Sequence, residues 1–164
     1  MWHTSVRRKS ADLTSPDALR PGLIFPARVD QLRAAHSDRR IDLELKGNVK
    51  GVWDGLRLQQ LLSNLVLNAI RYGAPDEPVR VGVTGHDADV CFEVRNSGPA
   101  IDRLTLERIF DPLSRGPHQE SKNAGGLGLG LYIASEIVKA HHGAIEGRSG
   151  HTQTAFAVRL PRSA

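Results

Sequence analysis

The sequence has a single cysteine, few aromatic residues and no long apolar run. Because Cys91 is alone, no disulfide can form within the chain, which fits a reducing compartment. No apolar stretch approaches the roughly 20 residues that a membrane helix needs, and no signal peptide is recognisable. We therefore expect a cytoplasmic domain, of a protein that could be membrane-anchored elsewhere in its full length.

A strong excess of charge of either sign is also missing. The chain has 164 residues, 22 of them Lys or Arg and 18 Asp or Glu, for a formal net charge of +4. Its arginines are spread along the chain rather than clustered, so nothing indicates a nucleic-acid partner. A hydrophobic content of 40% and a charged content of 24% are typical of one soluble globular domain with a real core.

Hydrophobic periodicity predicts the order of elements. Residues 1–24 lack it and are expected to be a linker, so we place the domain at 25–164. Helix-like spacing predicts helices at 25–35, 54–73, 104–110 and 132–142, the last closed by Gly143. Alternating residues predict strands at 41–45, 51–53, 79–83, 90–94, 144–147 and 155–160. We expect an α+β, two-layer sandwich with a mixed sheet and helices on one face, in which Cys91 is a small buried strand residue.

The longest predicted helix carries two stripes. Asp54 is a natural N-cap and Gly73 a natural end. The apolar stripe comprises Leu58, Leu61, Leu62, Leu65, Ala69 and Ile70, and the polar stripe comprises Arg57, Gln60, Asn64, Asn68 and Arg71. A solvated helix face favours Lys and Glu over Asn, whereas two amides one turn apart suit a hydrated cation and phosphate. The spacing alone leaves a ligand site and a solvated face as alternatives.

A glycine run, residues 125–130, leads into the last predicted helix. Such a run leaves backbone N–H groups uncovered at the positive end of the helix dipole, where they accept a phosphate. No Lys-Ser/Thr pair follows, so this is no P-loop, and the spacing is not that of a dinucleotide-binding fold. Flexible linkers also contain such runs, but this one opens a periodic helix and follows the asparagine helix.

Four segments resemble motifs of the sensor histidine kinases, in that family's order. Residues 64–72 resemble the asparagine box, 96–101 the first glycine box, 109–113 the phenylalanine box and 126–131 the second glycine box. They lie within residues 25–161, and the chain is identified as a member of the ATP-binding family of gyrase, heat-shock chaperones, histidine kinases and mismatch-repair proteins. The resemblance implies binding of ATP and Mg²⁺.

The resemblance also implies site residues. Asn68 is expected to bind Mg²⁺, Asn64 to face the phosphates, and Arg115, in a predicted lid over 111–124, to reach the γ-phosphate. Arg115 and Lys122 could instead be solvated charges of a surface loop. Arg71 could be an ordinary residue at a helix end, and Phe110 could be an ordinary core residue. The remaining expected nucleotide-binding residues are Arg71, Tyr72, Asn96, Gly98, Ile101, Phe110, Gly126, Leu127, Gly128, Leu129, Gly130 and Leu131.

Three positions depart from the patterns of related branches. Asn64 stands where the ATP-hydrolysing branches have a glutamate, and an amide cannot act as a general base at neutral pH. This argues against a hydrolase and against the anti-sigma serine kinases. Asn96 replaces the aspartate that accepts from adenine, and Ala100 replaces a glycine. We therefore expect weaker adenine binding, with a degenerate nucleotide-sensing or docking module as the alternative to a kinase.

No histidine has the setting of a phosphoacceptor. His86-Asp87 lies in a predicted hairpin turn, and the other histidines lack the context of the family's acceptor. The resemblance therefore implies that the chain is a catalytic part, which acts on a histidine of the protein's own dimerisation domain, missing here. It further implies a response regulator as the next phosphate acceptor and a homodimeric full-length protein.

Overall fold

The computed structural model describes residues 24–112 and 129–163. The predicted linker therefore lies outside the described residues, apart from its last residue, which belongs to a helix. Most of the predicted lid, with Arg115 and Lys122, also lies outside them. So do four residues of the glycine run, Gly125, Gly126, Leu127 and Gly128. Among the described residues, no helix has the length and apolarity needed to cross a membrane.

A five-stranded sheet forms one layer, with the strand order β1-β2-β3-β5-β4. β1 pairs in parallel with β2, and the remaining neighbours are antiparallel, so the predicted mixed sheet is confirmed. The predicted hairpin is β2 and β3. The strands are β1 (Ile41–Lys46), β2 (Val79–Gly85), β3 (Asp89–Ser97), β4 (Ala144–Ser149) and β5 (Gln153–Pro161).

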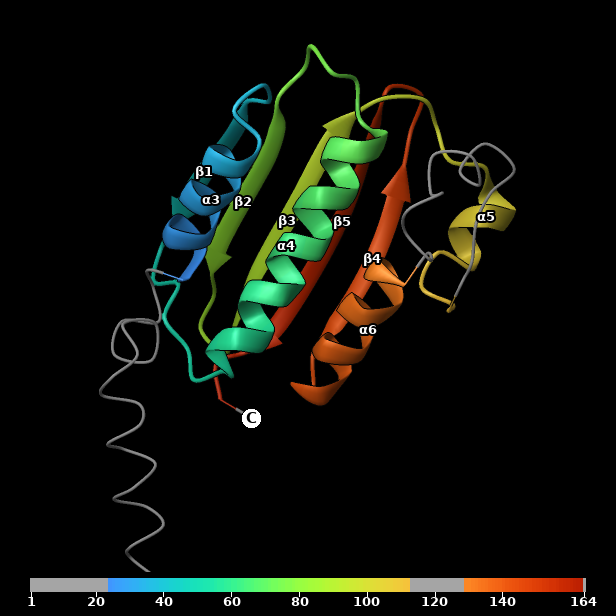
Figure 1. The fold of residues 1–164 in the computed structure, drawn as a ribbon. Coiled ribbons are helices and arrows are strands. Elements are labelled where there is room, and N and C mark those ends of the chain that lie inside the picture. Colours follow the sequence, from blue (N-terminus) through green and yellow to red (C-terminus); the bar gives the residue numbers. More distant parts are fainter. Residues whose placement is uncertain (1–23, 113–128, 164) are drawn as a thin grey trace, which may run out of the picture.

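The described residues form four helices. Three of them cover one face of the sheet, and the fourth lies beyond β4 (Figure 1). α3 (Ile24–Ala35) lies over β1 and β2, α4 (Gly55–Tyr72) over the middle of the sheet, and α6 (Gly130–Ala140) over β4 and β5 (Figure 1). The short α5 (Arg103–Glu107) is the fourth. The predicted two-layer α+β sandwich is therefore confirmed.

The core fills the space between the two layers. Alternate strand residues point to the helices, as the period of a strand requires, and meet the leucines of α4. The rings of Phe25 in α3 and Phe92 in β3 meet edge to face, with centroids 5.3 Å apart. The largest fully buried side chains are Phe25, Phe92, Phe156, Leu58, Leu61, Leu62, Leu65, Leu160, Val29, Val66, Val79 and Val81.

α4 begins and ends where its sequence predicts. The carboxylate of Asp54 accepts a hydrogen bond from the backbone N–H of Arg57 at 3.1 Å, which caps the first turn. Gly73 ends the helix with a φ of −83°, so left-handed backbone is not the reason for glycine here. A Cβ at Gly73 would lie 2.6 Å from the carbonyl oxygen of Ala69 and 2.9 Å from the Cβ of Asn96. Glycine therefore lets the helix end approach β3 closely.

Three local predictions are wrong. Residues 51–53 form no strand, because the backbone N–H of Val52 donates a single bond to the carbonyl of Arg162 rather than starting a ladder. The helix predicted at 104–110 ends already at Glu107. α6 ends at Ala140, and the left-handed residue after it is His142, with a φ of 59°, rather than Gly143.

The second face of the sheet carries no helix of the described chain, and we call it the open face (Figure 1). Cys91 lies on this face and is half-buried, so its expected place in the core is wrong. The reason is register: the core-facing positions of β3 are taken by Val90 and Phe92 on either side of it. Burial, followed by the charge of Asp89, raises the pKa of the Cys91 thiol, so the thiolate is disfavoured.

Candidate functional site

The asparagine helix and the helix after the glycine run lie side by side. The side-chain amide of Asn64 donates from Nδ2 to the carbonyl oxygen of Gly130, the first residue of α6, at 3.1 Å. At their other ends, the backbone N–H of Asp54 donates to Nε2 of His141 at 3.2 Å. The two helices therefore run antiparallel, and Asn64 lies at the N-terminus of α6.

This N-terminus can attract an anion. The first bond of α6 runs from the N–H of Ile133 to the carbonyl of Leu129, at 2.8 Å. The N–H groups that precede Ile133 have no partner within the helix, and they lie at the positive end of its dipole. The structure thus brings Asn64, Leu129, Gly130 and Leu131 together at a place suited to phosphate.

Asn68 lies one turn beyond Asn64 on the same side of α4. It is half-buried, and its amide forms no hydrogen bond within the described part of the chain. Arg57, Gln60 and Arg71 of the same stripe are exposed. The stripe is therefore divided: its two asparagines are half-buried, Asn64 against the start of α6, and its other members are exposed. An amide oxygen without a partner at such a half-buried position suits a hard cation.

The end of α4 meets the end of β3. The N–H of Ala74 donates to the carbonyl of Ser97 at 2.7 Å, and the N–H of Gly98 donates to the carbonyl of Thr152 at 3.0 Å. A Cβ at Gly98 would lie 3.1 Å from the carbonyl oxygen of Tyr72. The half-buried Tyr72 and the first predicted glycine box are therefore neighbours, as the predicted site requires.

Asn96 is 6% exposed and faces the helix layer. The sequence placed it just past a strand end, but β3 continues through Ser97. Its Nδ2 donates to the carbonyl of Ser97 at 3.3 Å, and this bond assigns the orientation of the amide. The remaining oxygen, Oδ1, has no partner among the described residues, so Asn96 presents an acceptor.

Two hydroxyl residues beside Asn96 were missed by the sequence reasoning. Thr154 is paired with Asn96 across β3 and β5 and is 4% exposed. The hydroxyl oxygen of Ser149 accepts from the N–H of Ile101 at 2.8 Å and lies 2.9 Å from that of Thr154. The sequence did contain one signal: Thr154 is a hydroxyl residue on the core-facing side of β5, two positions before Phe156 on the same side.

Phe110 and Ile101 lie against the core. The ring of Phe110 meets that of Phe156 edge to face, with centroids 5.9 Å apart and planes at 72°. Ile101 is half-buried beside the same cluster. These contacts give Phe110 the packing role that was one alternative for it, and they fix the start of the segment that leads towards the predicted lid.

Acidic groups contribute little to this site. Within the described residues, no three His, Cys, Asp or Glu side chains are placed to hold a metal ion together. Asp102, the N-cap of α5, has a lowered pKa because the N–H and hydroxyl of Thr105 donate to its carboxylate. A divalent cation between α4 and α6 would therefore depend on Asn68 and on oxygens that its ligand brings.

This combination of a mixed sheet, an asparagine helix and a glycine-led helix defines an ATP-binding α/β domain. The sequence profile described as histidine kinase-, DNA gyrase B-, and HSP90-like ATPase matches residues 53–164. The chain therefore belongs to this ATPase family. The catalytic domain of the histidine kinase ThkA has a similar fold, with a TM-score of 0.73 and 25% identity, over 87% of this chain and 92% of that one.

Curated relatives include sensor kinases of bacteria. The sensor histidine kinase TrcS of Mycobacterium tuberculosis is 44% identical over 118 residues, which are 67% of this chain and 23% of TrcS. The bacteriophytochrome of Pseudomonas aeruginosa is 34% identical over 121 residues, which are 74% of this chain and 17% of that protein. The chain thus spans less than a quarter of the length of these relatives.

Proposed function

We propose that this chain is the ATP-binding catalytic domain of a two-component sensor histidine kinase. It binds Mg²⁺-ATP and donates the γ-phosphoryl group to a histidine on a separate dimerisation domain, from which a response regulator receives it. The observation that carries this proposal is the bond from Asn64 to Gly130, because it brings the asparagine box and the second glycine box together. Membership of the ATPase family supports the nucleotide, and the sensor kinases among its relatives support the reaction.

The chain's own part in the reaction is positioning. Asn64 and the N–H groups at the start of α6 would hold the phosphates, and Asn68 would hold Mg²⁺, which neutralises phosphate charge when bound. Asn96 would accept from the adenine amino group through Oδ1, with Gly98 and Tyr72 beside the base. Neither amide of α4 is a general base at neutral pH, so transfer relies on orientation and on the incoming imidazole nucleophile.

Calorimetric titration tests the nucleotide site. ATP, ADP and GTP would be titrated with and without Mg²⁺ into the chain and into Asn68→Ala, with Gln60→Ala as a matched control on the exposed part of the same helix. We expect adenine nucleotides to bind, and only Asn68→Ala to lose the Mg²⁺-dependent part of the affinity. Equal effects of the two variants would contradict the assignment of Asn68.

Phosphotransfer needs a second assay. The chain would be joined to a dimerisation hairpin from a sensor kinase, and radiolabelled phosphate would be followed from ATP to the hairpin histidine. We expect transfer, absent when that histidine is replaced by glutamine. ATP binding without transfer would reject the kinase proposal and favour a nucleotide-sensing module.

A further inference from the structure

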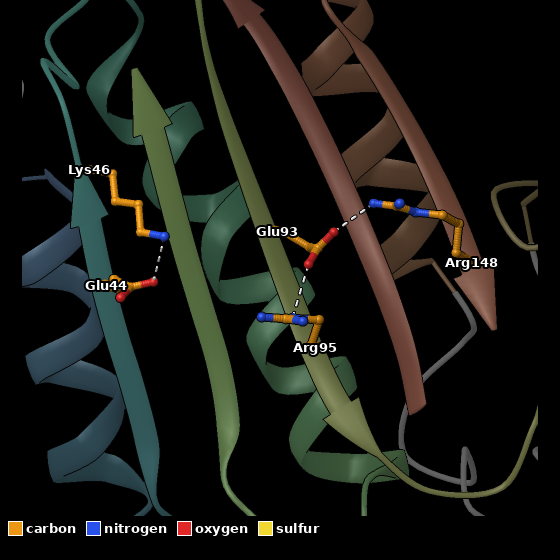
Figure 2. A network of polar contacts seen from close by, with 5 residues as sticks. All are labelled: Glu44, Lys46, Glu93, Arg95 and Arg148. Carbon is orange, nitrogen blue, oxygen red and sulfur yellow. Dashed lines mark hydrogen bonds and ion pairs between the residues drawn. The ribbon is translucent and has the colours of Figure 1, made fainter. Parts of the chain in front are cut away.

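A row of three polar side chains crosses one end of the sheet on its helix side. Ser149 of β4 is paired with Thr154 of β5, which is paired with Asn96 of β3. Arg148 lies on the open face, where it pairs with Glu93 at 2.6 Å (Figure 2), so alternation along β4 places Ser149 on the helix side. Further along the strands, this side of the sheet carries the buried hydrophobic core. The polar row therefore lies at the border of the core.

Ser149 uses its hydroxyl group twice. Its Oγ accepts a hydrogen bond from the backbone N–H of Ile101 at 2.8 Å and lies 2.9 Å from the hydroxyl oxygen of Thr154. Thr154 is 4% exposed, and Ser149 is its one side-chain partner within the described residues. A hydroxyl has one proton and two acceptor positions, so Ser149 can accept from Ile101 and donate to Thr154 at the same time. One small side chain thus joins the polar row to a neighbouring loop.

This loop, residues 98–101, carries the first predicted glycine box and connects β3 to α5 without helix or strand. Within the described part of the chain, two of its N–H groups are bonded, and both bonds run to the hairpin of β4 and β5. Gly98 donates to the carbonyl of Thr152 at 3.0 Å, and Ile101 donates to Ser149. Without the hydroxyl of Ser149, the backbone N–H groups of the loop would be held at its first residue only.

The loop is also packed closely against the end of α4. A Cβ at Gly98 would lie 3.1 Å from the carbonyl oxygen of Tyr72 and 3.7 Å from the Cα of Gly73. The first of these distances is shorter than ordinary van der Waals contact. The position of the loop therefore sets how much space is left for a ligand between it and the helix end.

We propose that Ser149 is a positioning residue for the base end of the nucleotide site, the part beside Asn96 and Gly98. Ser149 does not touch the nucleotide. Its hydroxyl fixes the loop through Ile101 and the hydroxyl of Thr154 beside Asn96. The phosphate end, at the start of α6, has none of these contacts. This inference rests on the proposed function, because it assigns a role within the same site.

Tripolyphosphate separates the two ends of the site, because it has the phosphates of ATP without the base. Calorimetry with Mg²⁺ would compare ATP and tripolyphosphate in the natural chain and in Ser149→Ala. We expect Ser149→Ala to weaken ATP about two- to tenfold, which corresponds to the loss of one neutral hydrogen bond, and to leave tripolyphosphate unchanged. Ser63→Ala makes the same change at a hydroxyl of α4 that has no partner among the described residues, and it should change neither affinity.

Hydrogen exchange tests the contact itself, without a ligand. We expect the amide of Ile101 to exchange faster in Ser149→Ala, whereas amides in the middle of β3 keep their rates. Unchanged exchange at Ile101 would overturn the proposal. So would an equal loss of affinity for ATP and tripolyphosphate, because Ser149 would then act on the whole fold rather than on the base end. If the natural chain bound neither ligand, the proposed function itself would fail, and this inference with it.

Discussion

At Asn96 a single side-chain hydrogen bond decides which atom of the amide is left to contact a ligand. Because Nδ2 donates to Ser97, the group left to face a base is the acceptor Oδ1. A carboxylate accepts more strongly than a neutral amide by about 1 kcal/mol, which corresponds to roughly fivefold in affinity. We therefore expect Asn96→Asp to bind ATP about fivefold more tightly in calorimetry, with GTP unchanged or weaker.

The control for this substitution is Asn48→Asp, which makes the same chemical change at an exposed residue. It should leave the affinity for ATP unchanged. Unaltered ATP affinity in Asn96→Asp, with a normal melting temperature, would place the base elsewhere.

Asp102 gives a prediction of pH dependence. Its pKa is lowered in the folded state by the N–H and hydroxyl of Thr105. A carboxyl group of this kind stabilises the fold above its unfolded pKa, and the contribution is lost as the pH falls through the folded pKa. Melting temperatures measured from neutral to acid pH should therefore fall less steeply in Asp102→Asn, which keeps the capping geometry.

Near neutral pH the natural chain and Asp102→Asn should have similar melting temperatures, because Asn and Asp are comparable N-caps. Asp38→Asn is the matched control, at an exposed position whose side chain forms no hydrogen bond or ion pair within the described residues. Its melting temperature should fall with pH as steeply as that of the natural chain. If the melting temperature depended on pH identically in all three proteins, Asp102 would not be the source of the acid sensitivity.

At the scale of elements, the C-terminus of α4 depends on a residue far away in the sequence. Arg39, in the turn after α3, donates to the carbonyl of Ile70 at 2.7 Å and to that of Ala74 at 3.1 Å. Carbonyls at a helix end lack partners within the helix, and a cation there also suits the dipole. Arg39→Met should lower the free energy of unfolding by about 1.5–3 kcal/mol.

Urea unfolding followed by circular dichroism measures this loss. Arg40→Met removes the neighbouring charge, whose side chain pairs with Asp42 at the surface, and should lower the free energy of unfolding by less than about 1 kcal/mol. Similar losses in the two variants would show that the bonds of Arg39 to α4 contribute nothing beyond a surface charge.

Elements were predictable where one periodicity dominated. The leucines of α4 and the valines of β2 and β3 carry clear periods, so their faces were correct. Contacts between distant residues, such as Arg39 with Ile70 or Asn64 with Gly130, leave no periodic trace. Residues 51–53 were predicted to be a strand, but in the structure one backbone bond joins Val52 to Arg162, just after β5, and no ladder follows.

The candidate site was predictable as a set of motifs rather than as a geometry. The resemblance grouped Asn64, Asn96 and Gly130, and the structure places the first and last of these in contact. Thr154 was missed because a core-facing hydroxyl in a strand does not indicate a site until its pairing with Asn96 is known. Cys91 was misplaced because its type was weighed without its register: Val90 and Phe92 on either side take the core face of β3, so Cys91 lies on the other face.

At the scale of the whole molecule, the sheet separates two charged surfaces. The proposed nucleotide site lies on the helix side, whereas Arg80 and Arg95 lie on the open face. Both sides carry exposed arginines, so a phosphate-bearing ligand could be assigned to the wrong one. Sites that share no side chains should respond independently to substitution, since distant effects are additive.

We therefore expect the affinity for Mg²⁺-ATP to respond to substitutions on the helix side alone. In calorimetric titrations Asn68→Ala should weaken the binding of Mg²⁺-ATP, whereas Arg80→Gln on the open face should leave it unchanged. The double variant should show the sum of the two free-energy changes within about 0.5 kcal/mol. If Arg80→Gln weakened Mg²⁺-ATP as much as Asn68→Ala does, the nucleotide would lie on the open face. The asparagine helix would then be a structural element rather than a binding one.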